Sequence, residues 1–419
     1  MKKINLIVGL ILTVSEGFSQ ALTLEQYRTR VLEYNQDIKK SVQAVNGALY
    51  SLKGIKTGFF PRIDANGNYA YQIETTELFP GTDLKHDNYG VEAGIMQNVY
   101  SGSGLRKQYD IAKLQHAIAR LGVEHTIDNT IYASDVNYWT LAANENLYRL
   151  SGQFVQIVGE LYEVVNKRFE EGAISKTDVL MVESRLKEAE LQLNTSVTNY
   201  KTALQAFNIM MGTAPDRLVI LADSIQEIVG TPVQEGLEKA LEKRADYQMA
   251  ILEIEIAKLN TDRIRAQFLP QLSVGVKEKY GTTLLNVDGK SKFTTTAVAQ
   301  IDIPIFHWGE MRYQVKLNRT LEETRELERS QLEDQVNLEL SRAWVNVTEV
   351  AKKLAIVYSS LDIAKNNLFL NTFSYNEGKL PILDVLSAQV TWLQAYTNVV
   401  SVNYQYKIAL AEYVRALGY

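Results

Sequence analysis

Apolar residues recur along the chain with two different periods. From Ile63 to Ile73, and again from Tyr89 to Val99, small or apolar residues alternate with polar ones, which predicts two strands, each with one apolar face. Residues 102–171 contain no proline, and their apolar positions return at steps of four and three, which predicts one very long helix. At roughly 1.5 Å per residue, this helix would extend about 105 Å.

The same order of elements occurs twice. "RFEEGAISKTDVL" (Arg168–Leu180) returns 206 residues later as "SYNEGKLPILDVL" (Ser374–Leu386), and "FFPRI" (Phe59–Ile63) returns 209 residues later as "FLPQL" (Phe268–Leu272). Repetition at a nearly constant distance of this length indicates a duplicated unit of roughly 200 residues.

The predicted domain organisation follows from this duplication. The first structural repeat covers residues 20–225, with a helix, a β-hairpin at about 62–100 and a long helical hairpin at 102–212. The second covers residues 226–419, with a helix, a β-hairpin at about 271–306 and a long helical hairpin at 308–418. The opening helices are predicted at Leu24–Lys56 and Glu235–Gln267, because a residue before proline avoids helical backbone angles and Pro61 and Pro270 follow.

Each long helix carries two lines of apolar residues rather than one. In the first repeat the lines are Ala143, Leu147, Leu150, Phe154, Ile157, Leu161 and Val164, and Tyr148, Val155, Val158, Tyr162, Val165 and Phe169. In the second repeat one line runs from Val336 to Leu368, and Ile356, Ile363 and Leu370 begin another. A helix with two such seams has neighbours on both flanks, which predicts a curved sheet of helices or a closed tube. A helix buried in a thick bundle is the alternative, but it would be apolar all round.

Four predicted strands in one chain are too few to close a transmembrane barrel, and open strand edges cannot face lipid. The alternation therefore predicts that several copies share one barrel. A pair of soluble periplasmic hairpins that covers the helices is the alternative.

The first 19 residues form a predicted secretory signal peptide, in which Lys2 and Lys3 precede an apolar run from Ile4 to Val14. No later run of about 18 apolar residues indicates a transmembrane helix. The chain has no cysteine, so packing alone must hold an exported fold together. The formal charge of −5 and the absence of a basic block argue against a nucleic-acid partner.

No enzymatic chemistry is indicated. His86, His116, His125 and His307 lie far apart and match no metal-binding spacing, so we expect no metal site. The "SGSGLRK" segment at 101–107 lacks the features of a phosphate-binding loop and is typical of a turn between a strand and a helix. We therefore expect neither catalytic residues nor a cofactor.

The order of these duplicated motifs, together with "VYSGSGLR" (Val99–Arg106) and "PIFHWGEMR" (Pro304–Arg312), resembles the TolC-like outer membrane efflux proteins. The resemblance implies a mostly helical fold with a β-hairpin in each of two repeats. Three copies would then form a helical barrel that continues into a 12-stranded β-barrel in the outer membrane, with the helices extending into the periplasm. It implies an exit duct for small molecules or proteins in a tripartite efflux or type I secretion system.

The implied partners are two further copies of the chain, outer membrane lipids, a periplasmic adaptor (a membrane fusion protein) and an inner-membrane transporter of RND, ABC or MFS type. A non-conducting, envelope-spanning coiled-coil structural protein is the alternative function. Such a tether needs only one seam per helix and no shared barrel.

The resemblance also assigns candidate residues at the helical tips. Asp178, Tyr375 and Asp384 match residues of the periplasmic gate in the best-studied member of the family. Ser387 stands where that member has a second acid. Asp178 also fits a helix capping box with Ser175, which is a purely structural role. The adaptor is expected to contact the outermost turns, which are Gly172, Ala173 and Ile174 in the first repeat and Gly378, Lys379 and Leu380 in the second. Leu380 replaces an arginine of that family member, with Lys379 adjacent.

Overall fold

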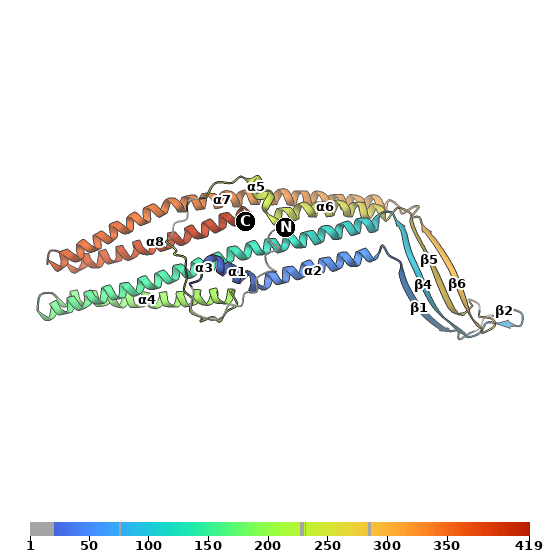
Figure 1. The fold of residues 1–419 in the computed structure, drawn as a ribbon, viewed down its shortest axis with the longest axis horizontal. Coiled ribbons are helices and arrows are strands. Elements are labelled where there is room, and N and C mark those ends of the chain that lie inside the picture. The colour runs from blue at the N-terminus through green and yellow to red at the C-terminus, as the bar shows by residue number, and fades with distance from the viewer. Residues whose placement is uncertain (1–20, 75–76, 227–229, 231, 284–285) are drawn as a thin grey trace.

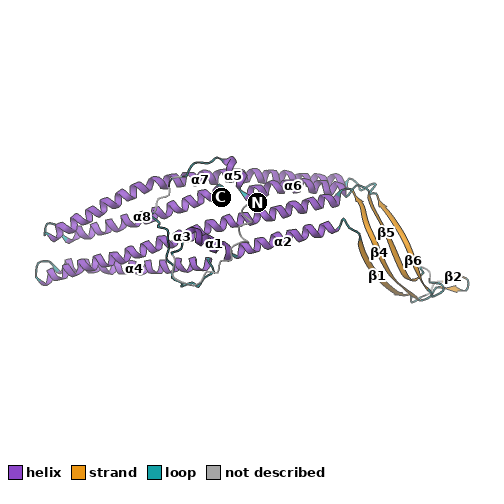
Figure 2. Cartoon of the chain, viewed as in Figure 1, coloured by secondary structure: helices purple, strands orange, loops and turns teal. Residues whose placement is uncertain are grey.

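The computed structural model describes residues 21–419 except 75–76, 227–229, 231 and 284–285. The predicted signal peptide lies outside the described residues. The molecule is a long helical body with a bent main sheet at one end, and two helical hairpins form the other end (Figure 1). Figure 2 shows that strands are confined to the sheet end and that the rest is helical.

Each repeat has the same elements in the same order. The first contains α1 (Leu24–Tyr34), α2 (Gln36–Thr57), β1 (Arg62–Tyr71), β4 (Asp87–Ser101), α3 (Gly104–Glu170) and α4 (Lys176–Met210). The second contains α5 (Leu237–Lys243), α6 (Ala245–Ala266), β5 (Gln271–Thr282), β6 (Ser291–Asp302), α7 (Glu310–Asn376) and α8 (Ile382–Ala416). The predicted fold class, mostly helical with one β-hairpin in each of two repeats, is confirmed.

The opening helix of each repeat is divided in two, so the prediction of one continuous helix was wrong. The first divides at Asn35 and the second at Arg244, 209 residues later, and neither residue has helical backbone angles. The side-chain oxygen of Asn35 accepts from the backbone N–H groups of Asp37 and Ile38, at 2.8 and 3.0 Å. A side chain that satisfies these N–H groups starts a new helix, which apolar periodicity alone does not reveal.

The loop between β1 and β4 also differs from expectation. It contains two short paired strands, β2 (Glu77–Phe79) and β3 (Thr82–Asp83), which form a small hairpin of their own beyond the main sheet (Figure 1). The corresponding loop of the second repeat contains no such pair among its described residues.

The main sheet joins the two repeats. Its strand order is β1-β4-β5-β6, all neighbours are antiparallel, and β4 of the first repeat pairs with β5 of the second from Gly90–Gly281 to Ser101–Gln271. The outer edges of β1 and β6 therefore have no strand partner among the described residues. Unpaired edges present a row of backbone N–H and C=O groups that can bind another chain.

Helix α3 lies at the centre of the helical body. It packs against α4 and α8 on the hairpin side and against α2 and α6 on the sheet side. This arrangement agrees with the two apolar lines predicted for α3. Both lines contribute buried residues, among them Leu150, Phe154 and Leu161 from one and Val158 and Val165 from the other.

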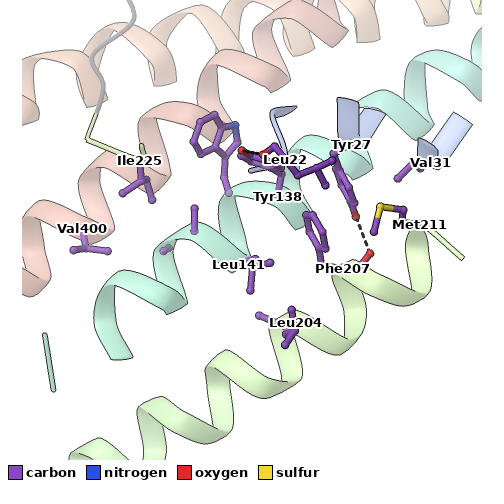
Figure 3. Close-up of a cluster of buried hydrophobic side chains, with 14 residues drawn as sticks. Leu22, Tyr27, Val31, Tyr138, Leu141, Leu204, Phe207, Met211, Ile225 and Val400 are labelled. Atoms are coloured by element: carbon purple, nitrogen blue, oxygen red, sulfur yellow. Dashed lines mark hydrogen bonds between the residues drawn. The ribbon is translucent and has the colours of Figure 1, made fainter. Parts of the chain in front are cut away.

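A dense apolar cluster fixes α1, α3, α4 and α8 together midway along the molecule (Figure 3). The ring of Tyr27 stacks on that of Phe207 with centroids 3.9 Å apart, and the Tyr27 hydroxyl donates to the Phe207 carbonyl at 3.2 Å. Tyr138 is fully buried beside them, and its hydroxyl donates to the Leu22 carbonyl at 2.9 Å. Buried aromatic rings with satisfied hydroxyls hold the hairpins in a defined position.

None of the helices in the described ranges is both long enough and apolar enough to pass through a membrane.

Candidate functional site

The two helical tips are built by the same turn. Gly172 and Gly378 have positive φ angles of 73° and 70°, which glycine adopts without strain. The N–H groups of Ala173 and Lys379, the residues that follow, donate back to the carbonyls of Arg168 and Ser374, at 2.8 and 2.9 Å. These bonds close the C-terminal ends of α3 and α7 and reverse the chain.

The tip residues differ in exposure. Gly172, Ala173, Gly378 and Lys379 are exposed, whereas Ile174 and Leu380 are half-buried. The outermost surface of both tips is thus formed by residues that have little contact with the core, as a docking surface requires.

The two tip aspartates have different surroundings although they occupy matching positions. The Asp178 carboxylate accepts from the backbone N–H and the hydroxyl of Ser175, at 3.1 and 2.9 Å, which completes the predicted capping box of α4. In the second repeat Pro381 takes the place of Ser175 and provides no side-chain cap. The half-buried Asp384 side chain makes no hydrogen bond with any described residue, so its carboxylate is available for another role.

Tyr375 is held by Arg168. The Tyr375 side chain is 5% exposed and belongs to an apolar cluster shared by both hairpins, which includes Val158, Val179, Ile382 and Val385. The guanidinium carbon of Arg168 lies 4.8 Å from the Tyr375 ring centroid. Two nitrogens of Arg168 also donate to the carbonyls of Tyr375 and Asn376, at 3.3 and 3.2 Å.

The Tyr375 hydroxyl is buried and has no hydrogen-bond partner among the described residues. Burial raises the pKa of this phenol, Arg168 opposes the rise, and the charge of Asp178 adds to it. Asp178 therefore lies close enough to influence Tyr375 electrostatically, but its carboxylate is bonded to Ser175. A buried hydroxyl without a partner costs about 1–3 kcal/mol, so a partner in another arrangement of the tips would be favourable.

Arg168 was not among the candidates identified from the sequence. It lies in the quoted motif of the first repeat, but the matching position in the second repeat is Ser374, so the duplication gave no reason to select it. A comparison of charges between the repeats would have found it. The last turn of α7 contains no basic residue, and Arg168 of α3 donates to a carbonyl at that end of α7 instead. Ser387, the remaining gate candidate, is exposed on α8.

The main sheet is apolar on its open face and polar on its sheltered face. On β4 and β5 the exposed residues include Tyr89, Val91, Ile95, Val276 and Tyr280. The sheltered residues of the same strands include Glu92, Lys277 and Lys279. This arrangement is the reverse of that in a water-soluble sheet protein, and it fits a surface that faces lipid.

The second apolar line of α7 is uncovered. Ile356, Ile363 and Leu370 are 67, 66 and 60% exposed, whereas Leu340, Val347 and Val350 on the first line are buried in a cluster with residues of α8. Further exposed apolar side chains lie beside this line near the tip, Phe369 and Phe373 among them. This exposed stripe, like the open edges of the sheet, is a surface that another chain could cover.

The model of the outer membrane efflux protein family matches residues 28–213 and 236–419, which is most of the chain. The chain belongs to this family. It is therefore an outer-membrane protein with an efflux-channel role, and its helical body extends into the periplasm. The resemblance drawn from the duplicated motifs is confirmed.

Sequence relatives agree with this assignment. The chain is 21% identical to outer membrane efflux protein BepC of Brucella suis over 410 residues, covering 95% of this chain and 87% of the relative. It is 21% identical to outer membrane protein TolC of Escherichia coli over 446 residues, covering 100% of this chain and 87% of TolC.

Solved structures of similar fold support the architecture. CusC has a TM-score of 0.83 at 14% identity, with 94% of this chain and 92% of CusC covered. The open state of the MtrE outer membrane channel of Neisseria gonorrhoeae has a TM-score of 0.81 at 16% identity, with 94% of this chain and 88% of MtrE covered.

No group of three or more His, Cys, Asp or Glu side chains suited to a metal ion occurs in the part of the chain that the structure describes.

Proposed function

We propose that three copies of this chain form the outer-membrane exit duct of a tripartite efflux or type I secretion system. The duct passes small molecules or proteins from a periplasmic pump assembly across the outer membrane. The observation that carries this proposal is the incompleteness of the single chain, with two open sheet edges and an exposed apolar line at Ile356, Ile363 and Leu370.

A neighbouring copy would satisfy both features at once. Edge-to-edge pairing of β6 with β1 of the next copy removes the unpaired backbone groups, which cannot face lipid. The same neighbour covers the apolar line of α7. Burial of a large aliphatic side chain stabilises by about 1.5–3 kcal/mol, so three such residues per copy contribute substantially to assembly.

The tips form the periplasmic gate in this proposal. Threefold symmetry brings each of Asp178, Tyr375, Asp384 and Ser387 into a ring of three. Asp384 supports the role most directly, because it lies in the first turn of α8 and its carboxylate is not used for capping. Like charges that approach one another around an axis are unfavourable unless they are hydrated, paired or protonated, which makes such a ring sensitive to cations.

Docking of partners takes place at the outermost turns. A periplasmic adaptor contacts Gly172, Ala173 and Ile174 of one tip and Gly378, Lys379 and Leu380 of the other, and an inner-membrane transporter of RND, ABC or MFS type supplies the energy. Glycine at the two reversals allows close approach of a partner backbone.

Assembly can be tested with substitutions on the exposed apolar line. Detergent-purified protein should scatter light as about three times the 47.3 kDa chain, less the signal peptide. Ile363→Asp should reduce the trimer, because it places a charge in the apolar contact between copies. Lys353→Asp, an exposed polar position on the same helix, should not. A stable monomer of native fold would contradict the trimer.

Conductance separates the duct from a non-conducting envelope tether. A trimeric duct inserted in a planar bilayer carries ion current, whereas a structural coiled coil carries none. Trimers that insert but never conduct would favour the tether.

A further inference from the structure

The sheltered face of the sheet carries a group of charged residues that the gate and the tips do not use. Glu92 on β4 is the direct cross-strand neighbour of Lys279 on β5, and Lys277 lies one rung away on the same face, opposite Gly94. The Lys277 ammonium forms an ion pair with Glu92 at 3.1 Å. Lys279 forms no ion pair with any described residue, so this part of the wall carries an excess positive charge.

Glycines on β4 make room for both lysines. A Cβ atom added to Gly90 would lie 2.9 Å from Cε of Lys279, and one added to Gly94 would lie 3.0 Å from Cγ of Lys277. The two lysine stems therefore lie flat along the wall, over positions without side chains. This placement holds the ammonium groups on the polar face, rather than letting them extend freely away from the sheet.

The remaining charges on this face are largely balanced. Arg62 pairs with Asp64 at 3.0 Å, and Lys292 approaches Asp288 at 3.9 Å. Asp302 lies at the helical end of β6, where its carboxylate accepts from the Gln300 amide. The excess positive charge is thus concentrated at the level of Lys277 and Lys279, within the strand region.

We propose that Lys277 and Lys279 form an anion-attracting belt on the inner wall of the strand region and bind small multivalent anions, such as phosphates, during passage. The inference rests on the proposed trimeric duct, in which the polar face of the sheet lines the lumen. Each copy contributes two lysines and one glutamate to the belt. A lumen with an excess of one sign of charge, bounded by a low-dielectric wall, raises the local concentration of the opposite ion.

The test uses the purified full-length trimer in planar bilayers. Current through the unmodified protein is recorded first, and its reversal potential in a KCl gradient gives the ratio of anion to cation permeability. The double substitution Lys277→Gln and Lys279→Gln should lower this ratio by about threefold, because six positive charges leave the lumen. Pyrophosphate added on the strand side should reduce the current of the unmodified trimer and have little effect on the double variant.

Glu278→Gln is the matched control. Glu278 lies between the two lysines on β5, but it is exposed on the apolar face and its carboxylate accepts from the Thr295 hydroxyl at 2.7 Å. Its removal should leave the permeability ratio and the pyrophosphate effect unchanged. If the double variant conducts with an unaltered permeability ratio, or if the control changes this ratio equally, the belt is overturned but the duct is not. Unmodified trimers that carry no current would overturn the duct and, with it, the belt.

Discussion

The guanidinium of Arg168 covers the ring of Tyr375 at 4.8 Å, and so joins the end of α3 to the end of α7. The contact links the two repeats at the tips, where each repeat otherwise ends in its own turn. Arg168 also donates to the last carbonyls of α7, which lack partners within the helix. Opening of the tips must therefore separate Arg168 from α7 or move both hairpins as one unit.

We predict that Arg168→Gln loosens the resting tips. The substitution removes a cation–π contact and a charged donor at a helix C-terminus, which together contribute about 1–2 kcal/mol. Resting conductance in planar bilayers should rise. Arg149→Gln is the control, because the exposed Arg149 lies on the same helix and its ion pair is with Glu145, far from the tip. An unchanged conductance in Arg168→Gln trimers would show that the two hairpins move together.

We predict that Asp384→Ala weakens the block of the channel by divalent cations. The half-buried Asp384 carboxylate is not used in capping, so its loss changes the charge of the proposed ring with little effect on α8. Asp178→Ala should instead lower the stability of the tip by about 1 kcal/mol, because it removes a capping box. Asp362→Ala, at an exposed site on α7, serves as the control for block. Equal loss of block at Asp362 and Asp384 would exclude a specific ring.

We predict that Ala173→Glu and Lys379→Glu abolish transport without loss of the trimer. Both positions are exposed and directly follow the tip glycines, and exposed substitutions usually change stability by less than about 0.5 kcal/mol. Transport in cells, together with the amount and heat stability of the trimer, should be measured for each variant. Compensating charge changes in the adaptor should restore transport. Full transport by stable double-variant trimers would show that these turns serve folding alone.

We predict an acid-dependent loss of stability at the junction between α6, α7 and α8. Arg244 binds Asp246 at 2.6 Å and Glu339 at 2.8 Å. Burial by itself would raise the pKa of Asp246, but the hydrogen bonds and charge of Arg244 outweigh it, and the pKa of Asp246 is lowered. The stabilisation is therefore complete above the ordinary carboxyl pKa of 3.8 and is lost as the pH falls through the lowered value.

Thermal unfolding of purified Asp246→Asn should check this sign. The variant should unfold at a lower temperature than the unmodified protein at pH 7, and the difference should shrink as the pH falls below about 4. Asp37→Asn is the control, because the Asp37–Lys40 pair is exposed and such pairs contribute about 0–1 kcal/mol. A difference that stays constant with pH would contradict the lowered pKa.

Much of the candidate site could be predicted from the sequence because its signals are local. The tip glycines, the Ser175–Asp178 capping box and the alternating strands each depend on residues that are near one another in the chain. Arg168 could not be found in this way. Its partner, Tyr375, lies 207 residues further along the chain, and only the packing of the two hairpins brings the side chains together.

The sequence by itself determined the duplication, the long helices and the two-faced strands, since periodicity and backbone preferences act over a few residues. Only the tertiary structure decided that the second opening helix divides at Arg244, whose guanidinium donates to Glu339 of α7 and to the Ala416 carbonyl of α8, and that β4 pairs with β5 across the two repeats. It also decided that the second apolar line of α7 stays uncovered. These features depend on which surfaces meet across long sequence separations, and a local pattern of apolar and polar residues does not specify that choice.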